Sequence, residues 1–430
     1  MNEEFNEYFN RQIKLWGQET QESLQNKKIA IIGSGGLGCS LAIALGASGI
    51  GEINLVDFDE VGVHNIHRQI GFKVGDDGKA KSEVLKELVH CYPEADVFSL
   101  IDFLTDKERE YYIQGKSVET SFLQKIPGVK KSYRKFLQLM PLAVEQFDLR
   151  GYDLVISSSY AVAKGVITSP DQIHVSYCHS PIRYAWDMQF QYLEESNLIK
   201  GLKSIYARYV LHKIRIWDFR SAYSVDYFLA NSNFIRKRIE KVYRRNADVI
   251  YPPVNVEEFS LCTIKEDFYL TASRMVPYKK VDLIVKAFNS MPDRKLVVIG
   301  CGPEFSKIRK MAKSNITIMG YQEYSILQDK MKKAKAFVFA AEEDFGIVPL
   351  EAQACGTPVI AFGKGGALET VIDGVTGVHF NKQDEESLVK AVEAFEHQSF
   401  DPVQIRKHAE SFSIERFRYE IKEYVSSVIE

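Results

Sequence analysis

Residues 342–352 read EEDFGIVPLEA and stand between the apolar run AFVFA at 336–340 and the sequence Gly356-Thr357-Pro358. The apolar run predicts a short buried strand. The proline of the stretch is typical of the first turn of a helix, and the glycine after it is typical of a helix end. Glu343 and Glu351 would then lie on either side of a strand-to-helix turn, at the edge of a parallel sheet where ligands bind. A charged turn beside an ordinary helix is the alternative interpretation.

The composition limits the classes of protein. The 430 residues are enough for two or three domains, and the formal net charge of −2 gives no global field that would favour nucleic acid. The six cysteines include no C-x-x-C pair, which disfavours a zinc site or a disulfide framework and is typical of a reducing cytosol. The polar start MNEE and the absence of a long apolar run predict neither a signal peptide nor a membrane span. We therefore expect a cytoplasmic protein.

The N-terminal part predicts a nucleotide-binding turn. A strand at 28–32 runs into GSGGLG at 33–38 and an apolar helix, and a second strand at 52–56 ends in Asp57. In this layout glycines let phosphates approach the backbone, the helix N-terminus attracts them, and the acid binds a ribose hydroxyl. A tight βαβ turn without a ligand is the alternative. The glycines concerned are Gly33, Gly35, Gly36 and Gly38.

Residues 8–90 resemble the ubiquitin-activating and thiamine-biosynthesis adenylyltransferase superfamily. The resemblance rests on the glycine loop and on RQI at 11–13, VDFD at 56–59, NIHRQ at 65–69 and GKAK at 78–81. It implies an ATP site formed by the glycine loop, Asp57, Arg68 and Lys81. The family's later strand, which ends in an aspartate that helps to hold magnesium, is not found, so the adenylation machinery is only half present.

Two basic stretches are interleaved with aromatic residues. Residues 121–140 hold five basic residues and no acid, and residues 200–220 hold six basic residues and the single acid Asp218. Helices of this kind can lie on an anionic membrane surface. A solvated helix face is the alternative interpretation, so peripheral membrane contact is an expectation that the sequence leaves open.

The C-terminal half predicts a second βαβ series after a proline-containing linker at 249–254. Arg274 and Lys279 follow one of its strands, and two such cations can neutralise a diphosphate without a metal. The sequence GKGG at 363–366 opens a helix, and its backbone N–H groups are suited to phosphate. In the first half a strand ends at His179, which is a candidate for hydrogen bonding to a polar ligand or, alternatively, an ordinary core histidine.

From about residue 84 to the C-terminus the chain resembles retaining glycosyltransferases of family 4, which have the two-domain GT-B fold. The resemblance rests on residues 151–159, 177–187 and 273–282 and on the E-x7-E pattern of Glu343 and Glu351. It is strongest to the branch that adds mannose, typically from GDP-mannose, to lipid-linked or polysaccharide acceptors.

The resemblance also implies roles for individual residues. Arg274 and Lys279 would hold the diphosphate, Glu351 the ribose and Glu343 the donor sugar. The remaining candidates are His179 beside the sugar, Gly365 and Gly366 beside the phosphates, and Gly302 near the nucleotide. No metal and no further cofactor is implied, and the leaving phosphate itself would take the acceptor's proton.

We therefore expect an α/β protein with two Rossmann-like domains facing across a cleft and an atypical N-terminal dinucleotide-binding βαβ segment. The family's opening strand, loop and helix are absent, and the adenylyltransferase-like segment stands in their place. Either strand 28–32 or strand 52–56 would complete the N-terminal sheet. The expected divisions are 1–90, 91–250, 251–412 and a C-terminal helix at 413–430.

Three other functions stay open. An ATP-dependent adenylyltransferase acting on a small carrier protein rests on residues 8–90 alone. A fusion that binds nucleotide without catalysis is the second, and a nicotinamide oxidoreductase, supported only by the glycine loop, is the last.

Overall fold

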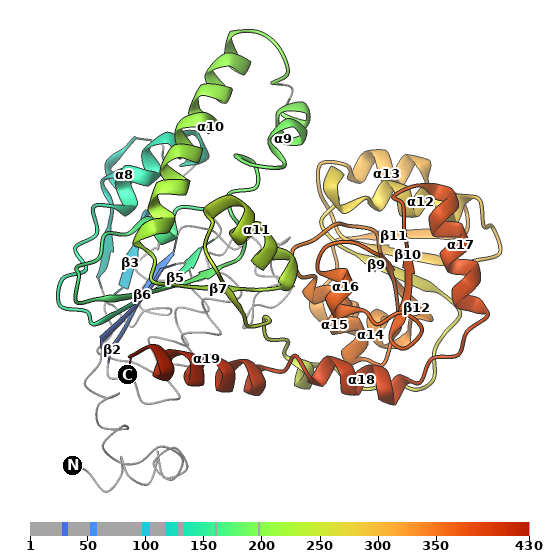
Figure 1. Cartoon of the computed structure of the whole chain (residues 1–430). Helices are drawn as coiled ribbons and strands as arrows, with labels where there is room; N and C mark the ends of the chain where they lie inside the picture. Colours follow the sequence, from blue (N-terminus) through green and yellow to red (C-terminus); the bar gives the residue numbers. More distant parts are fainter. Residues whose placement is uncertain are drawn as a thin grey trace, which may run out of the picture.

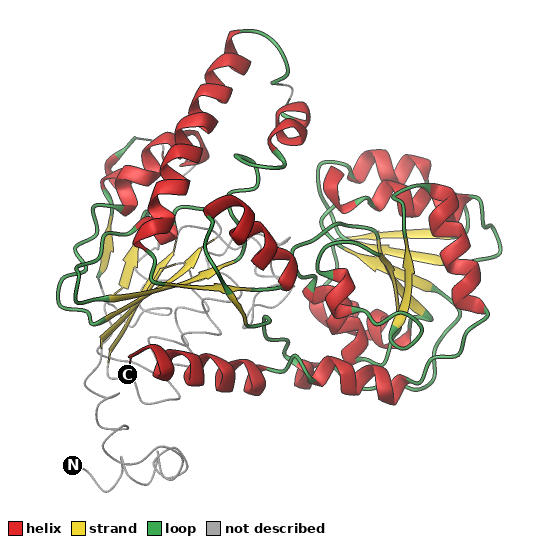
Figure 2. Cartoon of the chain, viewed as in Figure 1, coloured by secondary structure: helices red, strands yellow, loops and turns green. Residues whose placement is uncertain are grey.

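A computed structural model of the chain describes residues 28–32, 52–57, 97–103, 117–127, 129, 133–159, 161–196 and 198–429. These residues form two α/β domains, each built on a parallel sheet (Figures 1 and 2). The glycine loop at 33–38 and the apolar helix predicted after it lie outside the described residues.

The first domain contains an eight-stranded sheet in the order β4-β3-β2-β1-β5-β6-β7-β8, and every neighbouring pair is parallel. Strand β6 is buried at five successive positions, as expected when helices cover both faces of a parallel sheet. The strands are β1 (Lys28–Ile32), β2 (Glu52–Asp57), β3 (Val97–Ser99), β4 (Val118–Thr120), β5 (Leu154–Ser159), β6 (Ile173–Cys178), β7 (Tyr227–Ala230) and β8 (Asp248–Val249).

Both strands of the adenylyltransferase-like segment lie in the middle of this sheet. Ile29 of β1 is paired with Ile53 of β2 on one side and with Leu154 of β5 on the other. Asp57, at the end of β2, is paired with Ser99 of β3. The segment therefore supplies two interior strands of the first domain, and both end at the same edge of the sheet as β5 and β6.

The helices of the first domain are α8 (Met140–Val144), α9 (Gln189–Glu195), α10 (Leu202–Ser221) and α11 (Asn233–Tyr243), with short 3₁₀ turns η2 (Phe122–Lys125), η3 (Tyr133–Leu139), η4 (Ala163–Gly165) and η5 (Ala222–Ser224). The sequence predicts helical structure in the basic stretch at 121–140. Its described residues form the 3₁₀ turns η2 and η3, with α-helical backbone at Val129, before α8 begins. Pro127 follows the first turn, and proline lacks the N–H that a continuing helix needs.

A buried polar cluster fixes the inner end of α10. Asp218 forms an ion pair with Lys164 of η4, and both side chains are fully buried. The same carboxylate accepts hydrogen bonds from Trp186 Nε1 at 2.7 Å and from the Tyr243 hydroxyl at 3.0 Å. From this anchor the helix projects away from the sheet (Figure 1).

The second domain contains a six-stranded parallel sheet in the order β11-β10-β9-β12-β13-β14. Its strands are β9 (Tyr269–Ala272), β10 (Leu296–Ile299), β11 (Ile316–Gly320), β12 (Ala336–Phe339), β13 (Val359–Phe362) and β14 (Gly377–Phe380). Alternate strand residues enter two hydrophobic clusters, one containing Leu270 and Phe337 and the other Tyr269 and Val338. The sheet is thus covered on both faces.

Helices α12 (Val281–Asn289), α13 (Phe305–Met311), α14 (Tyr324–Lys333), α15 (Ile347–Ala354), α16 (Ala367–Thr370), α17 (Glu385–Glu396) and α18 (Pro402–Glu410) surround this sheet, with 3₁₀ turns η6 (Val256–Glu258) and η7 (Pro277–Lys279). Helix α16 begins directly after the sequence GKGG, as predicted, and is short because Val371 has extended backbone angles.

The final helix, α19 (Ile414–Ile429), returns to the first domain (Figure 1). The Phe417 ring contacts the Tyr177 ring edge-on, and the Tyr424 hydroxyl lies 3.1 Å from the Asp248 carboxylate. The chain therefore joins the two domains twice, through the segment after β8 and through α19.

Candidate functional site

The loops that follow β12 and β13 are joined at the carboxyl edge of the second sheet. Glu343 forms an isolated parallel bridge with Gly365, and the Gly366 N–H donates to the Glu343 carbonyl oxygen at 2.8 Å. A Cβ on Gly365 would lie 2.4 Å from that oxygen, and a Cβ on Gly366 would lie 2.3 Å from Phe345 Cα. Glycine is therefore required at both positions, and the structure brings these candidates and Glu343 together.

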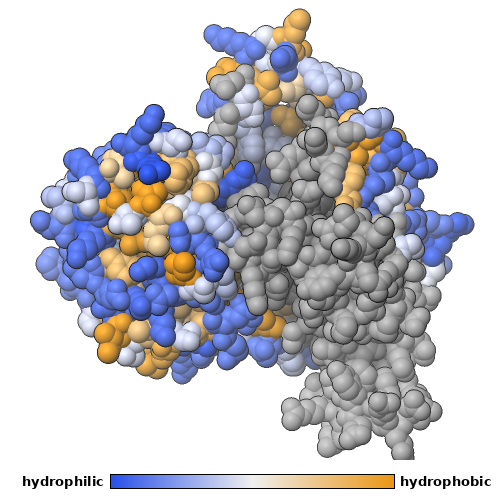
Figure 3. All heavy atoms as spheres, turned by 180° about the vertical axis from the view of Figure 1, so that it is seen from behind, coloured by the Kyte–Doolittle hydropathy of each residue, from blue (hydrophilic) through white to orange (hydrophobic). Residues whose placement is uncertain are grey.

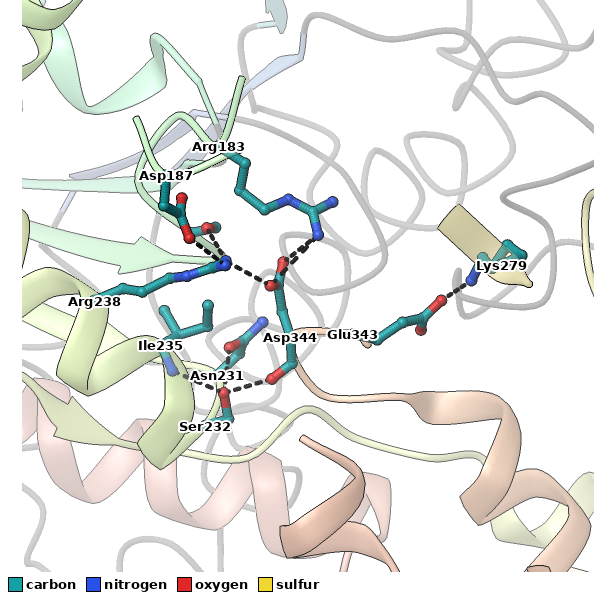
Figure 4. Close-up of polar contacts among 10 residues, drawn as sticks. Arg183, Asp187, Asn231, Ser232, Ile235, Arg238, Lys279, Glu343 and Asp344 are labelled. Carbon is teal, nitrogen blue, oxygen red and sulfur yellow. Dashed lines mark hydrogen bonds and ion pairs between the residues drawn. The ribbon is translucent and has the colours of Figure 1, made fainter. Parts of the chain in front are cut away.

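Lys279 and Glu343 form a buried ion pair at this edge (Figure 4). Lys279 ends η7, and the two residues are only 4% and 7% exposed. Because taking two charges out of water is costly, a buried pair is tolerated only when the charges lie close together. The pair therefore concentrates a cation and a carboxylate at the place where the sequence predicts a phosphate contact and a sugar contact.

Glu351 lies on α15, the helix that follows β12 in the chain, and its side chain is also buried. Its carboxylate adds to the effect of burial in raising the pKa of Tyr324 above its usual value. The Tyr324 hydroxyl therefore stays protonated, and it lies 3.3 Å from the Glu258 carboxylate. Gly346 precedes the helix with a φ of 87°, and a strand-to-helix turn lies between the two glutamates, as predicted.

The loops after β9 and β10 form a second part of the edge. The Met275 N–H donates to the Cys301 carbonyl oxygen at 2.8 Å, and Gly302 lies directly against the Met275 backbone. Arg274 is half-buried, and its guanidinium has no ion-pair partner within the part of the chain that the structure describes. Arg274 and Gly302 therefore lie on touching loops.

His179 lies at the carboxyl edge of the first sheet, one residue after β6. Its N–H donates to the Ser159 carbonyl oxygen at 2.8 Å, and its half-buried ring lies 5.4 Å from the Tyr177 ring. The histidine is thus a strand-end residue as predicted, with one side of its ring against an aromatic side chain.

Asp344, the neighbour of Glu343, connects the two domains (Figure 4). Its carboxylate lies 3.4 Å from Arg183 and 3.1 Å from Arg238, both in the first domain. The Ser232 hydroxyl lies 2.6 Å from the Asp344 carbonyl oxygen. Arg238 also pairs with Asp187 at 2.6 Å. The loop that carries Glu343 is therefore held against the first domain by charge and by hydrogen bonding.

Glu369 makes a second connection, from α16 to the start of α11. Its carboxylate accepts from the N–H groups of Asn233 at 2.8 Å and Phe234 at 3.0 Å, and from the Tyr251 hydroxyl at 3.0 Å. The first N–H groups of a helix have no partner within the helix, and the helix dipole favours a negative charge there. The loops after β12 and β13 are thus both tied to the first domain.

The sequence did not identify these connecting residues. The sequence assigns no role to Asp344, which lies in the stretch at 342–352, or to Glu369, which follows the sequence GKGG at 363–366. Ser232 carries a detectable signal, because it accepts from the Ile235 N–H as the cap of α11. That signal predicts a helix start but does not reveal contact with another domain.

The candidate second nucleotide site cannot be assembled from the described residues. Gly33, Gly35, Gly36, Gly38, Arg68 and Lys81 lie outside them, and Asp57 alone is placed, at the end of β2. Within the described ranges, no group of three or more His, Cys, Asp or Glu side chains is arranged to hold a metal ion.

Family models match two separate parts of the chain. Residues 237–412 match the model described as glycosyl transferases group 1, and residues 9–120 match the ThiF family. Both resemblances stated from the sequence are confirmed, but their bounds differ from those expected. The ThiF match continues past residue 90 to residue 120, and the glycosyl transferase match begins at residue 237 rather than at about residue 84.

Two relatives illustrate the two parts. A GDP-mannose-dependent monoacylated alpha-(1-6)-phosphatidylinositol monomannoside mannosyltransferase of Corynebacterium glutamicum is 39% identical over 114 residues, which are 23% of this chain and 30% of the relative. The adenylyltransferase and sulfurtransferase MOCS3 of Caenorhabditis briggsae is 39% identical over 83 residues, 19% of this chain and 21% of the relative. The chain thus spans less than a third of each of these relatives.

Solved structures resemble the whole chain. Anabaena HepE in complex with UDP and glucose aligns with a TM-score of 0.57 at 17% identity, covering 94% of this chain and 100% of that one. A glycosyltransferase from Rickettsia africae aligns with a TM-score of 0.56 at 16% identity, covering 94% and 99%. At such identity the likeness establishes the fold, which is the GT-B fold with two Rossmann-like domains.

Proposed function

We propose that this protein is a retaining glycosyltransferase that moves a hexose, with GDP-mannose as the donor, onto a lipid-linked or polysaccharide acceptor. The observation that carries the proposal is the buried pair of Lys279 and Glu343, which lies within the part that matches the glycosyl transferase model. Opposite charges held at the carboxyl edge of a parallel sheet can bind the two unlike ends of a sugar phosphate.

Different parts of the donor would contact different charged residues. Lys279 and Arg274 would contact the diphosphate, Glu343 the sugar hydroxyls and Glu351 the ribose. Gly365 and Gly366 let the loop after β13 approach closely enough for backbone contact with the phosphates. Since the Gly366 N–H donates to Glu343 in this structure, a phosphate would have to replace the carbonyl oxygen as its acceptor.

The proposed reaction breaks the bond between sugar C1 and the phosphate oxygen and forms a bond between C1 and the acceptor oxygen on the same face. The proton of the acceptor hydroxyl passes to the departing phosphate. Lys279 and Arg274 stabilise the negative charge that develops on the diphosphate, and each such contact contributes about 2–4 kcal/mol in comparable sites. His179 contacts the sugar from the first domain.

The donor and the acceptor come from the likeness to known proteins. The Corynebacterium relative is GDP-mannose-dependent by its name, whereas HepE was solved with UDP and glucose. UDP-hexoses are therefore the alternative donors. Metal independence is part of the proposal, because two cations are available to the diphosphate.

A donor screen tests the proposal. Purified protein is assayed with GDP-mannose and several UDP-hexoses, with lipid and polysaccharide acceptors, in the presence and absence of EDTA, and the anomeric configuration of the product is read by NMR. Lys279→Ala and Glu351→Ala should abolish transfer. Nucleotide binding of undiminished affinity in both variants would contradict the proposed site.

The ThiF match supports a second candidate function, the adenylation of a small carrier protein with ATP. ATP–pyrophosphate exchange would decide in its favour. Nucleotide binding without donor hydrolysis or transfer would instead favour a fusion that binds nucleotide and has no catalytic activity.

A further inference from the structure

Helix α10 carries apolar residues on two opposite faces. One face packs into the first domain through Leu211 and Ile214. The other faces solvent, and its five large apolar residues are 52–85% exposed. At 100° per residue these five fall within about 100° of one another, opposite the buried face. They are Leu202, Ile205, Tyr206, Tyr209 and Ile216, and we call this stripe the α10 face.

The α10 face is long and projects from the molecule. At 1.5 Å per residue, the distance along the helix from Leu202 to Ile216 is about 21 Å. The helix projects away from the sheet of the first domain (Figure 1). Ile199 before the helix and Phe190 on α9 are further exposed apolar residues. Soluble proteins rarely leave a large apolar patch in water, so a group of exposed apolar residues on one helix face indicates a binding surface.

Positive charge borders this face. Lys203 is exposed beside Leu202, and the Lys213 ammonium lies 5.5 Å from the centre of the Tyr209 ring. The Arg208 guanidinium lies 5.8 Å from the Phe190 ring. Residues 198–217 contain no acid. The space-filling view shows hydrophilic and hydrophobic side chains next to one another on the projecting part (Figure 3).

We infer that the α10 face docks onto the surface of an anionic lipid bilayer. Leucine and isoleucine would enter the boundary of the acyl chains, tyrosines would lie at the level of the headgroups, and the lysines would reach the lipid phosphates. No helix within the described ranges is long and apolar enough to cross a bilayer, so the contact is one of lying on the surface.

The charge pattern selects this occupant over a second copy of the chain. Two α10 faces packed together would bring lysines against lysines, with no acid on the helix face to compensate. Each lysine or arginine near an anionic membrane surface instead raises the partition coefficient of the protein onto the membrane roughly fivefold. The inference does not depend on the proposed transfer reaction, although it would bring the protein to lipid-linked acceptors.

Vesicle sedimentation of the full chain tests the apolar part. Wild type should sediment with vesicles of phosphatidylcholine and phosphatidylserine and much less with phosphatidylcholine alone. Leu202→Ser/Ile205→Ser should weaken binding at least tenfold. Ile264→Ser/Val403→Ser removes two exposed apolar residues of the second domain and should leave binding unchanged. Equal loss in both double variants, or no sedimentation of wild type, would overturn the inference.

A charge reversal tests the electrostatic part. Lys203→Glu/Lys213→Glu should reduce binding to anionic vesicles by more than twentyfold, roughly fivefold for each lysine removed, and the matched change Lys382→Glu should not. Binding should also weaken as salt is raised. If light scattering shows that wild type is a dimer and that Leu202→Ser/Ile205→Ser is a monomer, the face binds a second copy and the lipid assignment is wrong.

Discussion

Replacing Asp344 by asparagine should disconnect the loop that carries Glu343 from the first domain. The carboxylate lies between Arg183 and Arg238, and its side chain is only 19% exposed. Asparagine has nearly the same shape but no charge, so the guanidinium groups would lose their shared counter-charge. The same carboxylate raises the pKa of Arg183, because the two opposite charges attract each other across the boundary between the domains.

The size of the effect follows from the burial of the pair. Hydrogen bonds to charged groups contribute about 1.5–3 kcal/mol, whereas exposed ion pairs contribute about 0–1 kcal/mol. We expect a loss of about 2 kcal/mol for Asp344→Asn, which corresponds to a roughly 30-fold decrease in kcat/KM for transfer. The affinity for free nucleotide should change much less, because Lys279 and Glu351 both belong to the second domain.

The neighbouring acid Glu342 provides a matched control. It pairs with Lys364 at 3.1 Å within the second domain, and the two side chains are 34% and 59% exposed. Glu342→Gln should therefore lower kcat/KM less than about fivefold. Small-angle scattering should show a larger radius of gyration for Asp344→Asn than for Glu342→Gln.

A double-mutant cycle supplies the decisive result. Asp344→Asn and Arg238→Gln should be strongly non-additive in kcat/KM, because both changes remove the same contact. If the coupling energy is below about 0.5 kcal/mol, or if Asp344→Asn behaves like Glu342→Gln in both assays, the carboxylate does not hold the domains together and the reasoning is refuted.

Three further predictions concern the scaffold. Burial lowers the pKa of His174 to about 4 from 6.5, so the unfolded chain binds a proton that the folded chain does not. The free energy of unfolding should therefore fall by on the order of 3 kcal/mol as the pH drops from 6.5 to 4. In urea titrations His174→Gln should make the free energy of unfolding less dependent on pH, and an unchanged pH dependence would contradict the role of His174. Lys164→Met leaves the Asp218 carboxylate buried without its counter-charge and should lower the free energy of unfolding, measured by urea denaturation, by about 3–5 kcal/mol. A decrease below about 1 kcal/mol would show that the carboxylate is solvated. Gly366→Ala should push Phe345 away and cost about 1–3 kcal/mol, with a lower Tm and lost transfer. Gly201→Ala should also lower the Tm, because the φ of Gly201 is 89°, but it should keep transfer, because no atom lies within 4 Å of the added Cβ. Equal transfer activity of the two variants would contradict the close approach of Gly366 to Phe345.

The sequence was most informative where a continuous apolar run defines a strand. The bounds predicted for 28–32 agree with β1, and the prediction for 336–340 agrees with β12 to within one residue. Because parallel strands end at one edge of a sheet, the sequence placed Glu343 and Gly365 at the same edge, but it did not predict the direct pairing of the two residues.

Contacts between distant loops could not be predicted in this way. Arg238 and Asp344 are 106 residues apart, and no local pattern tells which loop of one domain will face the other. The basic composition around α10 was visible, but its outward apolar stripe appears only when the buried face is known. In the stretch at 121–140, Pro127 follows the first 3₁₀ turn, so the described residues form separate short segments rather than one helix.

The central position of β1 has a consequence for how such proteins can be recombined. An interior strand is hydrogen-bonded on both sides, so removing residues 1–90 would leave unpaired edges on β5 and β3, and open edges favour aggregation. What a parallel sheet requires of an interior strand is backbone pairing and two apolar faces, and a strand from an unrelated family meets that requirement. The part that matches the ThiF family, residues 9–120, contains β1 to β4, so a block of strands rather than a whole domain resembles another family here, while the sheet stays continuous.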